Sequence, residues 1–306
     1  MENVQVLIVG GGLAGISAAL WCQRLGLACV LIEAEPTLGG QLQQIHNEIW
    51  DFPPHIYKNG QALLAELQQN RKLAQLDCRF SEELKSIDYK HKVVTTSKQH
   101  YHADYVIIAT GVRPNTVPAL AGSKRLLPPR FSTSAQAELF RQKKVLVIGG
   151  GDRALESTWN LSAFADKIWL IVRSDTFRAR NEWVERVAQL SNVEVWMQSE
   201  AVGYRDEPAE TVVEIRRTVA AVPASLTLAV DWILPRIGVR PVTGALASLH
   251  TDEHGYIVAN TFQQSNLDWI YAIGDVTAGA AYASLSLALG QAMKAAKHIS
   301  LRIKEN

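Results

Sequence analysis

The first residues whose types and spacing could do chemistry are glycines near the start of the chain. Gly10, Gly12 and Gly15 fit the pattern G-x-G-x-x-G, directly after a short β-branched run and before a helical pattern that opens at Leu13 and Ala14. The first glycine permits a tight turn, the second lets backbone approach a pyrophosphate, and the third lets the helix pack on the strand. Free N–H groups at the helix start then face the phosphate charge. The pattern predicts a dinucleotide-binding turn; the alternative is a glycine turn in an ordinary α/β protein.

A carboxylate closes the next predicted strand. Glu33, followed by Ala34, ends the apolar run 28–33. At this place in a β-α-β unit a carboxylate accepts hydrogen bonds from the ribose hydroxyls of an adenosine. The same charge would repel a ribose 2′-phosphate. The first site therefore favours FAD or NAD over NADP.

A second glycine cluster, with alanine in the third position, repeats the pattern in the middle of the chain: Gly149, Gly151, Asp152, Arg153 and Ala154. The strand that follows it ends without an acid, and Arg173 and Arg178 come next. A guanidinium matches a phosphate in a bidentate fork. The second site therefore favours NADPH. The alternative is that these are ordinary solvated arginines on a loop.

The two clusters open two similar β-α-β units, and a second pair of matched segments separates them. Residues 109–114 and 236–241 both place a proline after a glycine, which indicates two hinges. The expected fold class is α/β, with two Rossmann-like dinucleotide-binding domains of three-layer ββα form, the second inserted in the first. We place an FAD-binding domain at 1–115 and 240–306, and an NAD(P)H-binding-like domain at 116–239.

Three further elements follow from periodicity. Residues 211–217 and 226–234 are predicted strands, separated by a turn at 221–224. Residues 282–303 form a predicted long helix rich in alanine and leucine.

Composition limits the classes of function. The 306 residues are 47% hydrophobic and carry a formal charge of +1, so no global field exists to hold nucleic acid or an anionic membrane. No apolar stretch is long enough to span a bilayer. Three cysteines argue against a disulfide framework, and the scattered histidines show no metal-ligand spacing. We expect a soluble, cytoplasmic protein with no metal site and no nucleic-acid or membrane partner.

Taken together, the motifs resemble the two-dinucleotide-domain flavoproteins of the thioredoxin reductase type, including the related ferredoxin/flavodoxin–NADP reductases. Besides the two glycine clusters, the resemblance is carried by three segments: Gly39-Gly40-Gln41-Leu42, Ala109-Thr110-Gly111 and Tyr271-Ala272-Ile273-Gly274-Asp275. It implies that residues 39–42 lie along the flavin and that Asp275 hydrogen-bonds the ribityl chain. It also implies that the start of the last helix, near Ser284 and Leu285, points its positive end at the flavin pyrimidine. The loop containing Trp50, Asp51 and Phe52 would lie beside the flavin.

The sequence departs from this family where thioredoxin reductases have their redox-active C-x-x-C. Counting back from Gly149 places four other residues there: Ser132, Thr133, Ser134 and Ala135. Thiol–disulfide exchange needs an attacking sulfur, so the usual route to thioredoxin is excluded. The cysteines present, Cys22, Cys29 and Cys78, are interpreted as small core residues.

The second site departs as well. Relatives that use NADPH usually have two adjacent arginines where this chain has Arg173 and Ser174, and a Ser or Thr where it has Arg153. NADH, a second flavin or no nucleotide therefore stay open beside NADPH.

The leading hypothesis is an FAD-dependent oxidoreductase without a dithiol, in which NAD(P)H reduces FAD and electrons pass to a non-thioredoxin acceptor. That acceptor would be ferredoxin, flavodoxin or a small molecule. Ferredoxin and flavodoxin are acidic, and docking would use basic residues around the missing dithiol, unless these only solubilise the surface: Lys124, Arg125, Arg130, Arg141, Lys143 and Lys144. The first alternative is a flavin-binding electron relay or regulatory protein whose second site holds another flavin or is empty, and the second is a thiol/disulfide oxidoreductase. The resemblance further implies a homodimer.

Overall fold

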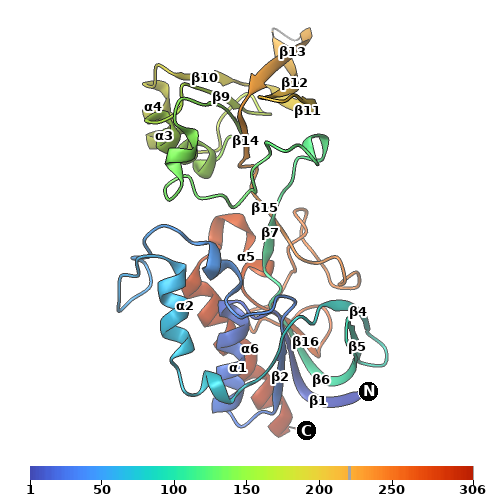
Figure 1. The fold of residues 1–306 in the computed structure, drawn as a ribbon. Coiled ribbons are helices and arrows are strands. Elements are labelled where there is room, and N and C mark those ends of the chain that lie inside the picture. The colour runs from blue at the N-terminus through green and yellow to red at the C-terminus, as the bar shows by residue number, and fades with distance from the viewer. Residues whose placement is uncertain (220–221, 306) are drawn as a thin grey trace. The chain divides into compact units, whose positions relative to one another are not determined.

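The structure is a computed structural model that describes residues 1–219 and 222–305, and it divides into two compact units. One unit comprises Met1–Arg113 and Arg240–Asn306, and the other comprises Pro114–Val239 (Figure 1). The chain passes between them twice, and the two linkers pair as β7 (Val112–Pro114) and β15 (Val239–Pro241). The architecture is α/β with parallel sheets, as the sequence predicts.

The larger unit is built on a seven-stranded sheet in the order β3-β2-β1-β6-β5-β4, with β16 also beside β6. Its strands are β1 (Glu2–Val9), β2 (Cys29–Ile32), β3 (Asp77–Arg79), β4 (Leu84–Asp88), β5 (Val93–Thr96), β6 (His100–Ile108) and β16 (Ile270–Ala272). Strands β3, β2, β1, β6 and β16 run parallel, whereas β4 and β5 form an antiparallel hairpin that joins β6.

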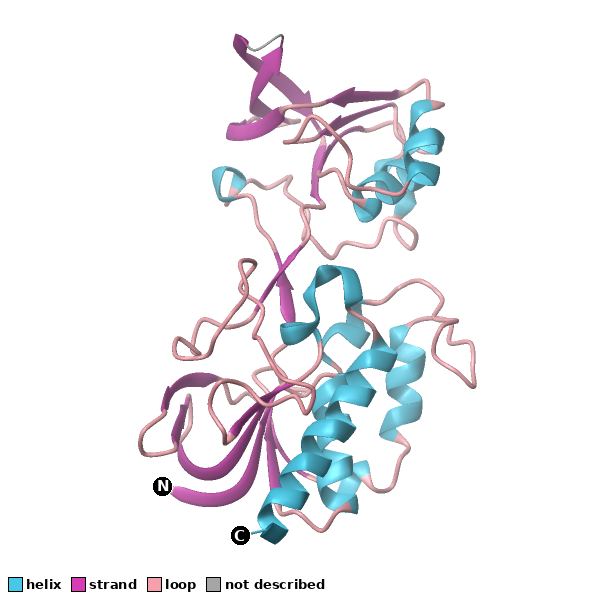
Figure 2. Cartoon of the chain, turned by 180° about the vertical axis from the view of Figure 1, so that it is seen from behind, coloured by secondary structure: helices cyan, strands magenta, loops and turns pink. Residues whose placement is uncertain are grey.

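Helices cover one face of this sheet. They are α1 (Leu13–Arg24), α2 (Gly60–Gln68), α5 (Asp275–Tyr282) and α6 (Leu285–Glu305), with 3-10 turns η1 (Gly40–Gln44) and η2 (Leu73–Gln75). Figures 1 and 2 show α1 and α6 side by side along the sheet. Residues 6–9 are all buried, which explains why their sequence is continuously apolar rather than alternating.

The smaller unit has three layers. A parallel sheet in the order β10-β9-β8-β14 lies between helices and a three-stranded meander, β11-β12-β13. Its elements are η3 (Pro118–Leu120), η4 (Ala137–Phe140), β8 (Lys144–Ile148), α3 (Asp152–Ser162), β9 (Lys167–Ile171), α4 (Asn181–Ala188), β10 (Val193–Trp196), β11 (Ser199–Asp206), β12 (Thr211–Val219), β13 (Val222–Val230) and β14 (Trp232–Pro235). Because side chains alternate along a strand, Val145 and Val147 pack under α3 while Leu146 and Ile148 pack under the meander.

Three predicted elements differ from the structure. The predicted strand 226–234 is broken at Asp231, so that β13 belongs to the meander and β14 to the parallel sheet. The Asp231 side chain accepts a hydrogen bond from Lys144 N at 2.8 Å, and its own N–H donates to the Lys144 carbonyl, which directs the chain into the second sheet. In the predicted turn 221–224, residues 222–224 are strand and Ala221 lies outside the described residues.

The predicted helix 282–303 begins later. Tyr282 ends α5, and α6 starts at Leu285 after an extended residue, Ala283. None of the helices within 1–219 and 222–305 is long and apolar enough to cross a membrane.

Replacing Leu146 by alanine tests the three-layer packing. Leu146 is 0% exposed between the parallel sheet and the meander, so Leu146→Ala should lower the free energy of unfolding of this unit by about 2–5 kcal/mol. Leu226→Ala is the matched control, because Leu226 lies on the meander with 37% of its surface exposed. Chemical denaturation followed by circular dichroism measures both; equal losses would contradict the layer assignment.

Candidate functional site

The first glycine turn joins β1 to α1 by close backbone approaches. Gly10 has φ +113°, and a Cβ on it would lie 2.4 Å from Ala109 O; a Cβ on Gly15 would lie 1.9 Å from Gly10 O. No atom lies within 4 Å of the corresponding position at Gly12. The turn is thus closed on the sheet side and open at Gly12, where the N-terminus of α1 begins with Leu13. This shape fits a pyrophosphate bound at the helix N-terminus.

Glu33 is oriented by the same turn. Its side chain is buried, with Oε2 accepting from Gly11 N at 2.5 Å and Oε1 accepting from Glu35 N at 2.8 Å. A carboxylate offers about four lone-pair sites, so both oxygens keep capacity to accept ribose hydroxyls. The next residue, Ala34, is exposed.

The segment 39–42 packs against the glycine turn. Gly39 N donates to Gly11 O at 2.9 Å, and a Cβ on Gly40 would lie 3.1 Å from Gly12 Cα. Leu42 is buried in a cluster with Leu13. The structure therefore brings residues 39–42 next to the glycine turn.

Asp275 reaches this place from the end of β16. Its Oδ2 accepts from Gln41 Nε2 at 2.6 Å. Burial raises the pKa of the Asp275 carboxyl, and the hydrogen bond from Gln41 opposes that shift. A half-buried carboxylate with lone pairs to spare fits a ligand that presents hydroxyl groups, as a ribityl chain does.

Gln291 was not predicted from the sequence. Its buried side chain accepts from Gly274 N at 2.6 Å and donates to Thr277 Oγ1 at 3.1 Å, which fixes the turn before Asp275. The sequence offers one signal for it: a glutamine on the buried, alanine-rich face of α6, beside Ala288 and Ala292.

The segment Ala109–Gly111 crosses below the first turn. Ala109 N donates to Val9 O at 2.8 Å, and Thr110 Oγ1 donates to Val242 O at 2.8 Å. Gly111 has φ +63°, and a Cβ there would lie 3.8 Å from Gln41 Nε2. This segment thus lies against the Gln41 side chain that donates to Asp275.

The start of α6 lies beside the same cluster. Leu285 packs with Leu13 and Leu42, and the exposed Ser284 caps the helix because its Oγ accepts from Leu287 N at 3.0 Å. The carbonyl of Asp51 accepts from Ser286 Oγ at 3.4 Å, which ties the 50–52 loop to this helix start. In that loop the Trp50 side chain is 75% exposed.

The second glycine turn repeats the geometry between β8 and α3. Gly149 has φ +142°, and a Cβ on it would lie 2.2 Å from Arg236 O, whereas the position at Gly151 has no atom within 4 Å. Ala154 is fully buried, as a third-position small residue should be, and Arg153 is exposed. The open place at Gly151 again adjoins a helix N-terminus.

A loop after β9 folds back onto this turn. Arg178 N donates to Gly150 O at 2.8 Å. The side chains of Arg173 and Arg178 are exposed, and Ser174 Oγ donates to Thr176 O at 2.6 Å. Two guanidinium groups therefore lie on a loop that is hydrogen-bonded to the glycine turn. The Ser174 hydroxyl is used in a hydrogen bond within that loop.

Residues 132–135 form a turn before α3. Ser132 Oγ accepts from Ala135 N at 3.2 Å and lies 3.3 Å from Ser134 Oγ, and Thr133 is buried. Buried Arg236 holds the preceding segment, donating to Pro129 O at 2.6 Å, to Phe131 O and to Ser157 Oγ at 2.9 Å. Burial lowers the pKa of Arg236 to about 10.

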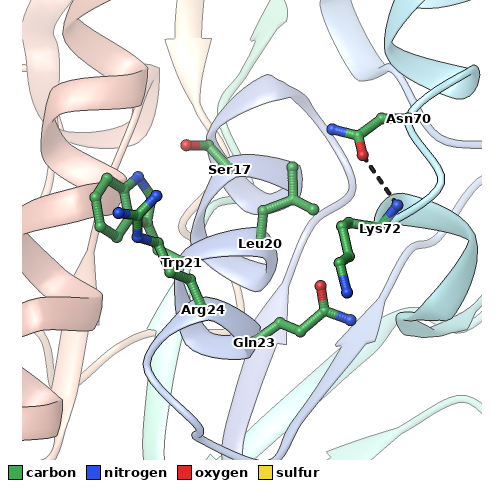
Figure 3. A pocket seen from close by; sticks show the side chains of 7 residues that line it. All are labelled: Ser17, Leu20, Trp21, Gln23, Arg24, Asn70 and Lys72. Atoms are coloured by element: carbon green, nitrogen blue, oxygen red, sulfur yellow. Dashed lines mark hydrogen bonds between the residues drawn. The ribbon is translucent and has the colours of Figure 1, made fainter.

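Figure 3 shows a pocket of about 520 Å³ on α1 that is separate from both turns. Its lining is Ser17, Leu20, Trp21, Gln23, Arg24, Asn70 and Lys72. The Arg24 guanidinium lies 5.3 Å from the ring centre of Trp21 on one side, and Asn70 Oδ1 accepts from Lys72 N at 2.9 Å on the other. It contains none of the predicted site residues. Within the described chain, no group of three or more His, Cys, Asp or Glu side chains is arranged to hold a metal ion.

Comparison with known proteins identifies the class. Residues 4–298 match the pyridine nucleotide-disulphide oxidoreductase family, and the chain belongs to this family of FAD-dependent oxidoreductases.

Among individual proteins, the chain is 31% identical to a thioredoxin reductase of Listeria innocua, over 89% of this chain and 86% of that one. It is 29% identical to a ferredoxin–NADP reductase of Flavobacterium psychrophilum, over 90% and 82%. The fold matches that of Lactococcus lactis thioredoxin reductase with a TM-score of 0.79 and 22% identity, over 99% of this chain and 100% of that one.

Gly15→Ala tests the first turn. The new methyl would meet Gly10 O at 1.9 Å, so the strand and helix must separate, at a cost of about 1–3 kcal/mol or more. We expect purified Gly15→Ala protein to have lost bound FAD, measured as flavin absorbance per chain. Gly290→Ala in α6 is the control, because no atom lies within 4 Å of its Cβ position; flavin retained by Gly15→Ala would contradict the assignment.

Proposed function

We propose that this protein is an FAD-dependent oxidoreductase that takes electrons from NADPH and passes them to an acceptor other than thioredoxin. FAD, when bound, supplies the redox chemistry, and the protein supplies binding, orientation and tuning. The observation that carries the proposal is the convergence of the first glycine turn, Glu33 and the Gln41–Asp275 pair in one unit.

The FAD site that we propose uses residues of the larger unit. The pyrophosphate would bind at the open N-terminus of α1, Glu33 would accept hydrogen bonds from the adenosine ribose hydroxyls, and Asp275 would accept one from a ribityl hydroxyl. The capped start of α6 directs its partial positive charge toward the flavin. The remaining residues of this site are Gly10, Gly12, Leu13, Ala14, Gly15, Ala34, Gly40, Gln41, Leu42, Asp51, Ala109, Thr110, Gly111, Gly274, Ser284 and Leu285.

The smaller unit is the proposed nicotinamide nucleotide site. Glu33 follows the last residue of β2, Ile32, whereas Val172 follows the last residue of β9, Ile171. The second site thus has no carboxylate at the place that would repel a ribose 2′-phosphate, and Arg173 comes next. This difference supports NADPH over NADH.

A mechanism without a protein dithiol follows from the cysteines. The sequence holds only Cys22, Cys29 and Cys78, and no two have C-x-x-C spacing. Hydrogen bonding to Cys29 and burial raise the pKa of the Cys22 thiol. Burial and the neighbouring Asp77 raise the pKa of Cys78. Hydrogen bonding to Cys22 lowers the pKa of the Cys29 thiol, whose Sγ donates to Ala19 O at 3.8 Å. None of the three thiols is exposed, and a nucleophilic thiol must be accessible, so we infer that electrons leave the flavin directly.

The acceptor that we propose is a ferredoxin- or flavodoxin-like protein, with a small molecule as the simpler possibility. Similarity to ferredoxin–NADP reductases supports a protein acceptor. Of the basic residues considered for docking, Arg141 pairs with Glu138 at 2.6 Å and Lys143 with Asp231 at 3.3 Å. Those pairs reduce the positive charge available to an acidic partner.

A homodimer and a cytoplasmic location are parts of the same proposal. The proposal of a homodimer rests on the family resemblance alone. The location is supported by the free state of all three cysteines, since disulfides persist mainly in oxidising compartments.

A second candidate is an electron relay or regulatory protein whose smaller unit holds another flavin or is empty. Ser174 favours it, because its hydroxyl bonds to Thr176 O and adds no cation for a 2′-phosphate, a group that FAD lacks. Counting flavins per chain in purified protein separates the candidates: two flavins indicate a relay, and one flavin with NADPH turnover an enzyme.

Hydride entry is tested by mixing the oxidised, FAD-loaded protein with NADPH or NADH under anaerobic conditions. We expect rapid bleaching of the flavin absorption by NADPH and slower bleaching by NADH, because the second site lacks an acidic ribose acceptor. Absence of bleaching by both would end the proposal for the smaller unit.

Replacing all three cysteines by alanine tests the route of electrons out of the flavin. The triple variant should keep the wild-type kcat for reduction of ferredoxin or of an artificial dye. Loss of the fully buried Cys22 thiol should cost about 1 kcal/mol of stability, so thermal unfolding is recorded in parallel. Folded protein with abolished electron transfer would show that a thiol takes part.

A further inference from the structure

The loop after β9, beside the second glycine turn, carries a serine between two arginines. Arg173 and Arg178 are exposed near the turn, and Ser174 stands between them with its hydroxyl bonded to Thr176 O at 2.6 Å. A phosphate dianion is bound best by several forked donors. Ser174 supplies none.

A third arginine is fastened to the same turn. The carboxylate of Asp152, the first residue of α3, accepts from Arg180 N through Oδ1 and from Arg180 Nε through Oδ2, both at 2.8 Å. Two residues earlier, Arg178 N donates to Gly150 O at 2.8 Å. The segment 178–180 is therefore held against the glycine turn at two points.

This arrangement leaves the donor fork of Arg180 available. The hydrogen bonds within the described chain use its Nε and backbone N, and the side chain is 69% exposed. Its two Nη groups can therefore donate to a ligand while Nε stays on Asp152. A guanidinium oriented in this way loses little side-chain freedom when a phosphate binds.

The ion pair has little value as a purely structural device. Exposed ion pairs contribute little to stability, and the backbone bond from Arg178 to Gly150 holds the loop without it. A carboxylate at the N-terminus of α3 would weaken the attraction of that helix for a nucleotide phosphate, unless its charge is matched by a cation. Arg180 matches that charge and presents further donors beside it.

We propose that Arg180, positioned by Asp152, is a specificity-determining residue that completes the clamp for the 2′-phosphate of NADPH. The inference depends on the proposed function, because it requires the smaller unit to bind a nicotinamide nucleotide. It goes beyond that proposal by naming the group that replaces the missing arginine at Ser174.

The test compares two nucleotides that differ only in the 2′-phosphate. FAD-loaded wild type, Arg180→Gln and Arg180→Lys are titrated with NADP⁺ and NAD⁺ by isothermal titration calorimetry. Arg205→Gln is the matched control, since Arg205 forms an exposed ion pair with Glu207 in the same unit. Arg180→Gln should weaken NADP⁺ binding by about 10-fold more than NAD⁺ binding, as expected for the loss of a charge-assisted hydrogen bond to the 2′-phosphate.

Arg180→Lys should fall between wild type and Arg180→Gln, because lysine keeps the charge without the fork. Equal weakening of both nucleotides, or of neither, would overturn the role in 2′-phosphate recognition, since general damage to the site affects both ligands alike. If wild type binds neither nucleotide, the nicotinamide assignment of the smaller unit fails, and the role of Arg180 falls with it.

Discussion

The constraint on which the rest of the structure depends is the closeness of the backbone to itself at the two glycine turns. A Cβ on Gly15 would lie 1.9 Å from a carbonyl oxygen of its own turn, and one on Gly149 would lie 2.2 Å from Arg236 O. Only hydrogen fits at such separations. Each strand and the helix after it therefore lie close together. The two glycines with no close neighbour, Gly12 and Gly151, adjoin the first N–H groups of α1 and α3. The neighbouring loops pack against the same two turns.

Hydrogen bonds to the surrounding loops then give each turn its chemical character. In the larger unit, carboxylates converge: Glu33 is held by Gly11 N, and Asp275 by Gln41. In the smaller unit, the corresponding loop carries arginines, fastened through Gly150 O and Asp152. Two copies of one fold thus carry opposite charges beside their glycine turns, and this difference is the physical basis for the two different nucleotides that we propose.

The fold class could be predicted because its signals are local. Glycines at fixed spacing and strands buried on both faces are visible in the sequence without knowledge of distant contacts. The break at Asp231 could not be predicted, since it depends on Lys144, which is far away in the chain. The same holds for Gln291, whose partner Gly274 lies on another element. The pairing of Asp152 with Arg180 could not be predicted either, because it depends on how the loop after β9 folds back onto the turn.

Arg236 shows how a single buried side chain holds the segment 129–131 in place. Its guanidinium is buried, and the ion pairs found among the described residues do not include it. It instead donates to the carbonyls of Pro129 and Phe131 and to Ser157. Removing a charge from water is costly, and burial accordingly lowers its pKa to about 10. Several short donor bonds to carbonyl dipoles offset that cost. The backbone oxygen of Arg236 also lies close to Gly149. One residue thus contacts both the second glycine turn and the loop segment that leads to Ser132.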